Sequence, residues 1–107
     1  MENGIVQAFR MQLKTGFEEE YKKRHDEIWP ELSDLLVQAG IREYYIFLDP
    51  GTLALFAFQR LSTDHQTGDL ATLPIMKRWW DYMADLMEVN PDNSPRSVAC
   101  PEVFRLL

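Results

Sequence analysis

The N-terminal part of the chain alternates between two patterns of hydrophobic spacing. Residues 8–13 place apolar side chains at every second position, which predicts a strand. Helical spacing follows over residues 17–28, among glutamates and lysines that favour helix. Pro30 interrupts this helix and suits the first turn of a second helical piece, and Gly40 stands where a left-handed cap would end it.

Two strands are predicted next. Residues 41–48 are rich in β-branched and aromatic side chains, and residues 53–59 are almost wholly apolar. Asp49-Pro50-Gly51 between them has the residues of a turn, so the two strands should form an antiparallel hairpin.

The C-terminal half holds one strongly periodic helix between less regular segments. Residues 62–69 are polar and indicate a loop or a short helix, and Pro74 then begins a helix whose apolar stripe reaches Leu86. Residues 90–95 are too rich in turn formers for a regular element, although their polar groups could line the mouth of a pocket. The apolar residues near the end predict a final strand that contains Val103, Phe104 and Leu106.

This order, β-α-β-β-α-β, predicts an α+β fold of the ferredoxin-like type. We expect residues 1–107 to form one domain, an antiparallel sheet with helices on one face. The strand over residues 53–58 is apolar on both faces, so the uncovered side of the sheet should not face water. We therefore expect a homodimer in which the sheets of the two copies face one another.

Composition excludes several classes of function. The chain has 17 acidic and 11 basic side chains, a net charge of −6, which gives no electrostatic basis for binding nucleic acid or an anionic membrane. Its longest apolar run is far shorter than the roughly 20 residues of a membrane span. Cys100 is the only cysteine and no signal peptide is evident, so a cytoplasmic protein is expected. No metal-binding or nucleotide-binding motif occurs, so no metal or cofactor is expected.

His25 is the leading candidate for chemistry. Tyr21 and His25 are four residues apart, so their side chains share one face of the predicted helix. Imidazole changes protonation near neutral pH and can therefore donate a proton and take it back. The alternative is that His25 only ends the charged run 18–27 as another solvated residue.

Two adjacent aromatic pairs could bind a ligand. Trp79 and Trp80 point about 100° apart on a helix, so one should pack inward while the other borders a cleft or an interface. A tryptophan at a cleft could stack on the C–H face of a sugar ring. Tyr44 and Tyr45 point to opposite faces of their strand, so one should lie in the core and the other could reach a ligand.

Four linked motifs resemble those of the L-rhamnose mutarotase family. Their order and spacing agree over nearly the whole chain, which makes a chance match improbable. The motifs are Tyr21-x-x-Arg24-His25-x-x-Ile28-Trp29-Pro30-Glu31-Leu32, Tyr44-x-Ile46-x-Leu48-Asp49, Arg78-Trp79-Trp80-x-Tyr82-Met83 and Asn90-Pro91-Asp92-Asn93-Ser94-Pro95.

The resemblance implies a ferredoxin-like domain that pairs into a dimeric α/β barrel and interconverts the α and β anomers of L-rhamnose. It implies that His25 is the proton donor and that four aromatic residues contact the sugar: Tyr21, Tyr44, Trp79 and Trp80. The proton acceptor stays open among a tyrosine, a carboxylate such as Asp92 and an ordered water. Other functions of such small barrels are a cofactor-free monooxygenase, a haem-degrading protein and a non-catalytic sugar-binding module.

Overall fold

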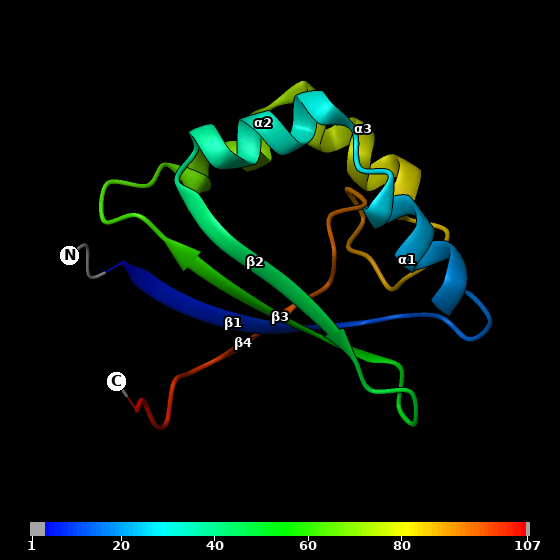
Figure 1. The fold of residues 1–107 in the computed structure, drawn as a ribbon. Helices are drawn as coiled ribbons and strands as arrows, with labels where there is room; N and C mark the ends of the chain where they lie inside the picture. The colour runs from blue at the N-terminus through cyan, green and yellow to red at the C-terminus, as the bar shows by residue number, and fades with distance from the viewer. Residues whose placement is uncertain (1–3, 107) are drawn as a thin grey trace.

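A computed structural model describes residues 4–106 and shows a four-stranded antiparallel sheet with its helices on one side (Figure 1). The strands are β1 (Ile5–Gln12), β2 (Ile41–Leu48), β3 (Ala54–Leu61) and β4 (Val98–Cys100), in the spatial order β2-β3-β1-β4. The helices are α1 (Glu18–Asp26), α2 (Pro30–Gln38) and α3 (Pro74–Met83), and a short 3₁₀ helix, η1 (Thr67–Thr72), precedes α3. The predicted ferredoxin-like α+β fold is confirmed.

The break between α1 and α2 lies where the sequence places it. Pro30 is the first residue of α2, and Trp29 before it has an extended backbone, as a residue before proline prefers. Gly40 ends the helical segment with a φ of +109°, a conformation that favours glycine. A Cβ at this position would lie 2.6 Å from the Ser62 Oγ, so no larger residue fits here.

Alternation along the strands gives the sheet two different faces. The inner face packs on the helices, and Met11, Leu55 and Ala57 are among its buried side chains. Leu32, Ile75, Trp79 and Met83 cover them from the helices, while Leu86 and Met87 come from the segment after α3. The core of the molecule is therefore the layer between the sheet and its helices.

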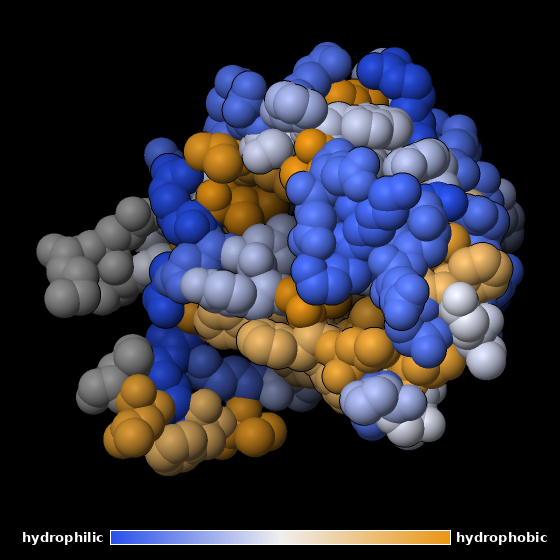
Figure 2. Space-filling view, turned by 45° about the vertical axis from the view of Figure 1, so that its right-hand side comes forward, coloured by the Kyte–Doolittle hydropathy of each residue, from blue (hydrophilic) through white to orange (hydrophobic). Residues whose placement is uncertain are grey.

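The outer face carries no element of the described chain; many of its side chains are apolar, although Arg10 and the Glu43–Arg60 ion pair also lie on it. Its exposed side chains include Tyr45, Phe47, Phe56 and Val98, and Figure 2 shows hydrophobic residues along the lower side of the molecule, away from the helices. The expectation that this face is unsuited to water is consistent with the structure.

The last strand differs from its prediction. β4 comprises Val98–Cys100 and pairs with β1, whereas Val103, Phe104 and Leu106 lie in an exposed segment without regular structure. Pro101 directly follows β4 and has no amide proton for continued pairing. Two other element boundaries differ from the prediction. Leu53 has a φ of +64° and belongs to the turn before β3, and α3 ends at Met83 rather than near Leu86.

Candidate active site

A cavity of about 1050 Å³ lies between the inner face of the sheet and the helices. Side chains from all three long helices, from the strands and from the loop after α3 line it. The five residues that the sequence proposes for the site all take part: Tyr21, His25, Tyr44, Trp79 and Trp80. The fold thus brings together residues from α1, β2 and α3.

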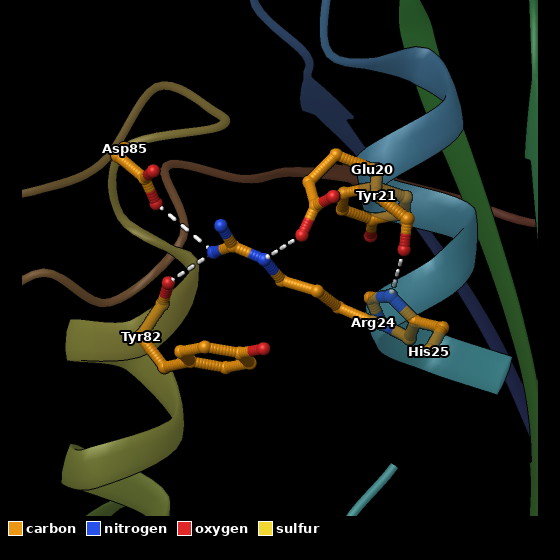
Figure 3. Close-up of polar contacts among 6 residues, drawn as sticks. All are labelled: Glu20, Tyr21, Arg24, His25, Tyr82 and Asp85. Carbon is orange, nitrogen blue, oxygen red and sulfur yellow. Dashed lines mark hydrogen bonds and ion pairs between the residues drawn. The ribbon is translucent and has the colours of Figure 1, made fainter. Parts of the chain in front are cut away.

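His25 lies in the last turn of α1 with a defined ring orientation. Its Nδ1 is 3.1 Å from the Tyr21 carbonyl oxygen, and because a carbonyl only accepts, Nδ1 carries the proton (Figure 3). In the neutral imidazole this leaves Nε2 unprotonated. Burial lowers the pKa of His25 below its ordinary value of 6.5, although the Tyr21 carbonyl and the Asp26 charge oppose the change. His25 is therefore half-buried beside the cavity and not merely the end of a solvated run.

Arg24, the neighbour of His25, fastens α1 to the end of α3. Its Nε donates to Glu20 at 2.7 Å, while Nη1 donates to the Tyr82 carbonyl at 2.5 Å and to Asp85 at 3.1 Å (Figure 3). The guanidinium also lies over the Tyr82 ring, 4.4 Å from its centre. Since only 14% of the Arg24 side chain is exposed, these contacts hold the His25 turn against α3.

The two tryptophans have different surroundings, as their spacing predicts. Trp79 is buried and meets the His25 ring edge-on, with ring centres 5.6 Å apart, and it also packs against Trp29. Trp80 is half-buried at the flank of the core. Both line the cavity, so they present a flat apolar surface close to the imidazole.

The tyrosines contribute hydroxyl groups to the same cavity. Burial raises the pKa of Tyr21, and Tyr44 raises it further. Tyr44 is 38% exposed as a whole residue, but its hydroxyl is buried and its pKa rises to about 12. Both hydroxyls remain protonated at neutral pH and can donate hydrogen bonds.

The expectation that one residue of the Tyr44–Tyr45 pair lies in the core is wrong. Tyr45 lies on the outer face of the sheet, 49% exposed, where its ring packs beside Phe47 and Phe58. The two side chains do point to opposite faces, but the outer face has no covering layer within the described chain.

The loop over residues 90–95 forms part of the cavity wall. The Asn90 amide donates to the Ser94 hydroxyl, and Asn93 and Ser94 line the cavity. Asp92, one of the candidates for the proton acceptor, does not line the cavity, and its carboxylate accepts hydrogen bonds from the Ser94 amide and hydroxyl. These bonds lower the pKa of Asp92 and make it a weak base.

Sequence reasoning missed two polar residues of the cavity, Gln7 on β1 and Gln59 on β3. Gln59 is only 7% exposed and accepts a hydrogen bond from Gln7. Alternation along the strand over residues 53–59 places Gln59 on the same face as the apolar Leu55 and Ala57. A glutamine on a buried face was the signal that could have revealed it.

Within residues 4–106, no helix is both long and apolar enough to cross a bilayer. In the same range, no group of three or more His, Cys, Asp or Glu side chains is arranged to hold a metal ion.

Comparison with known proteins agrees with the motifs. The family model of L-rhamnose mutarotase matches residues 7–106. The chain belongs to the L-rhamnose mutarotase family. It is 53% identical to an L-rhamnose mutarotase of Flavobacterium johnsoniae over 99% of both chains, and 53% identical to one of Bacteroides thetaiotaomicron over 94% of this chain and 96% of that protein.

A solved structure extends the agreement to the fold. The crystal structure of L-rhamnose mutarotase from Formosa agariphila superposes with a TM-score of 0.89, at 51% identity, over 96% of this chain and 99% of that one. The part matched by the mutarotase family model includes all five predicted site residues. These relatives give no support to the monooxygenase or haem-degrading alternatives.

Proposed function

We propose that the chain, acting as a single domain, interconverts the α and β anomers of L-rhamnose in the cavity between sheet and helices. The observation that carries the proposal is the position of His25, whose ring lies beside Tyr21 and Trp79 on the wall of this cavity. Membership of the mutarotase family supports the choice of substrate.

The reaction requires one proton donor and one proton acceptor. The donor protonates the ring oxygen while the acceptor removes the proton of the anomeric hydroxyl, so the C1–O5 bond breaks and an open-chain aldehyde forms. Rotation about the C1–C2 bond and closure on the other face give the second anomer, and the protons return. General acid–base assistance of this kind contributes about 10²–10⁴-fold.

In this scheme His25 is the proton donor. The donor is the imidazolium form: the Tyr21 carbonyl holds the Nδ1 proton, and the second proton, on Nε2, leaves to the ring oxygen and returns. A donor with a lowered pKa is a stronger acid, which eases the transfer to a weakly basic ring oxygen.

The aromatic residues bind the sugar in distinct ways. Trp79 and Trp80 offer flat apolar surfaces for the C–H face of the ring. Tyr21 and Tyr44 donate hydrogen bonds to sugar oxygens, and their raised pKa values make them poor proton acceptors. Asp92 does not line the cavity, whereas Glu18, Glu19 and Asp26 do, so the proton acceptor of this scheme is one of these carboxylates or a bound water.

The test is NMR exchange between the α and β anomeric proton signals of L-rhamnose, with and without the protein. Micromolar protein should increase the exchange rate well above the spontaneous rate. If the protein binds L-rhamnose without faster exchange, the chain is a non-catalytic sugar-binding module; if it neither binds nor accelerates, the proposal fails.

Association of two copies through the outer faces of their sheets belongs to the same proposal. Tyr45, Phe47, Phe56 and Val98 are 44% or more exposed and lie on this one face, with Phe58 beside them. A second copy of the same face would bury these side chains and complete the dimeric α/β barrel.

We further propose that the protein acts in the cytoplasm, without nucleic acid or membrane partners. A net charge of −6 disfavours both kinds of partner, and a chain with one cysteine, Cys100, can form no internal disulfide. Fractionation of the native source cell would test the location.

A further inference from the structure

One row of side chains on the inner face of the sheet is polar among apolar neighbours. Gln7 of β1 stands opposite Gln59 of β3, and Gln59 stands opposite Tyr44 of β2, so the three side chains cross three strands in register. The next row on the same face consists of Phe9, Ala57 and Ile46, without polar groups.

The polar row is joined by hydrogen bonds. The Gln7 Nε2 donates to the Gln59 Oε1 at 2.6 Å. The strand register places Tyr44 beside Gln59 on its other side, and the Gln59 side chain lowers the pKa of the Tyr44 hydroxyl, as a neighbouring donor does. All three residues line the cavity, and Gln59, at the centre, is 7% exposed. A buried amide whose oxygen accepts a hydrogen bond in this way is held in one orientation.

This connection has a direction. A glutamine amide has one accepting oxygen and one donating NH₂ group, and the oxygen of Gln59 is turned toward Gln7. Its NH₂ group therefore donates to the Tyr44 oxygen, and this bond opposes the upward effect of burial on the pKa of Tyr44. Since the Tyr44 oxygen accepts from Gln59, the single hydroxyl proton of Tyr44 is left to point into the cavity.

We propose that Gln59, oriented by Gln7, is a positioning residue that sets Tyr44 as a hydrogen-bond donor to one hydroxyl oxygen of the sugar. The inference rests on the proposed function, since it requires the sugar to occupy this cavity. It also predicts selectivity: a deoxy sugar that lacks the matching hydroxyl leaves the Tyr44 hydroxyl without its acceptor and binds more weakly.

Gln59→Glu tests the direction of the row with almost no change in shape. A carboxylate accepts from both neighbours, so it takes the Tyr44 proton away from the sugar. The KM for L-rhamnose should rise about tenfold, the value of one hydrogen bond near 1.4 kcal/mol, with a smaller change in kcat. In a Tyr44→Phe background the same substitution should add no further increase in KM.

Gln38→Glu is the matched control, because Gln38 is exposed on α2 and does not line the cavity. It should keep the wild-type KM. Should Gln59→Glu fail to fold, Gln7→Leu replaces it: Gln7 is exposed, and its loss releases the Gln59 amide and raises KM in the same direction.

The outcomes separate the inference from the function on which it rests. A wild-type protein without mutarotase activity overturns the proposed function. An active wild type with unchanged KM in Gln59→Glu overturns the inference, because the row then runs in the opposite direction and Tyr44 donates to Gln59. If Gln59→Glu raises KM equally in the wild-type and Tyr44→Phe backgrounds, the inference is also overturned, because Gln59 then acts independently of Tyr44 and has only a structural role.

Discussion

The two faces of the sheet consist of alternate residues of the same strands, yet they differ in polarity and in what covers them. On the inner face, Gln59 and Tyr44 join a polar row inside a cavity that the helices cover. On the outer face, Tyr45, Phe47 and Phe56 form an exposed aromatic surface. One face can therefore specialise in recognising a small polar molecule while the other is suited to burial against a flat apolar partner.

The difference shows that apolar exposure alone does not locate an active site. The outer face has the more exposed aromatic rings, but the inner face combines aromatic walls with His25 and with hydroxyls of raised pKa. Chemistry requires titratable groups of fixed orientation, and only the inner face of the described chain has been shown to hold them around one cavity.

His25→Ala should have the largest effect, because it removes the proton donor from the inner face. We expect the catalysed anomer exchange rate to fall by about 10²–10⁴-fold. The variant should remain folded, since His25 is only half-buried. NMR exchange spectroscopy on L-rhamnose measures the effect, and full activity in a folded variant would contradict the role of His25.

Phe47→Glu changes the outer face alone, so it should weaken the association of two copies without changing a residue of the cavity. Phe47 is 62% exposed, so the monomer tolerates the change, but a charge in the interface weakens the dimer by roughly 100-fold or more. Light scattering after gel filtration gives the molecular mass. Val37→Glu, at a 58% exposed site on α2, is the control and should leave the association unchanged; equal effects of both would place the interface elsewhere.

Arg24→Ala tests how the helices support the inner face. Loss of the contacts to Glu20, the Tyr82 carbonyl and Asp85 should lower the free energy of unfolding by about 1–3 kcal/mol. Urea denaturation measures this value. Lys22→Ala removes an exposed ion pair on the same helix and should lower the free energy of unfolding by less than about 0.5 kcal/mol. Equal decreases in the two variants would contradict the stabilising role of the Arg24 contacts.

The smallest effect concerns pH. Burial lowers the pKa of folded His25, so below about pH 6.5 the unfolded chain binds more protons than the folded one at this position. The resulting loss of stability begins as the pH falls through 6.5 and is complete below the lowered pKa. His25→Gln should show a shallower decrease in stability between pH 7.5 and pH 5 than the wild type; identical slopes would contradict the burial of a neutral imidazole.

The sequence predicted the elements better than their ends. Spacing and Pro30 located the helices, because local geometry determines both. The apolar residues from Val103 to Leu106 suggested a strand, but pairing depends on the partner strand, and the ladder with β1 ends before Pro101. A hydrophobic pattern alone does not contain that information.

The site shows the same limit. His25 and Trp79 were found from helical spacing and motif resemblance, and both line the cavity. The row formed by Gln7, Gln59 and Tyr44 depends on the register of three strands, which residue types do not determine by themselves. The outer position of Tyr45 likewise depends on which face the helices cover.

The two faces of the sheet are distinguished most sharply by sugar binding, which we propose for the inner face alone. A titration with L-rhamnose, followed by NMR of the aromatic side chains, tests this directly. We expect the indole signals of Trp79 and Trp80 and the ring signals of Tyr44 to shift with sugar concentration, while those of Tyr45 and Phe47 stay constant. Shifts at Tyr45 and Phe47, with none at the tryptophans, would contradict it.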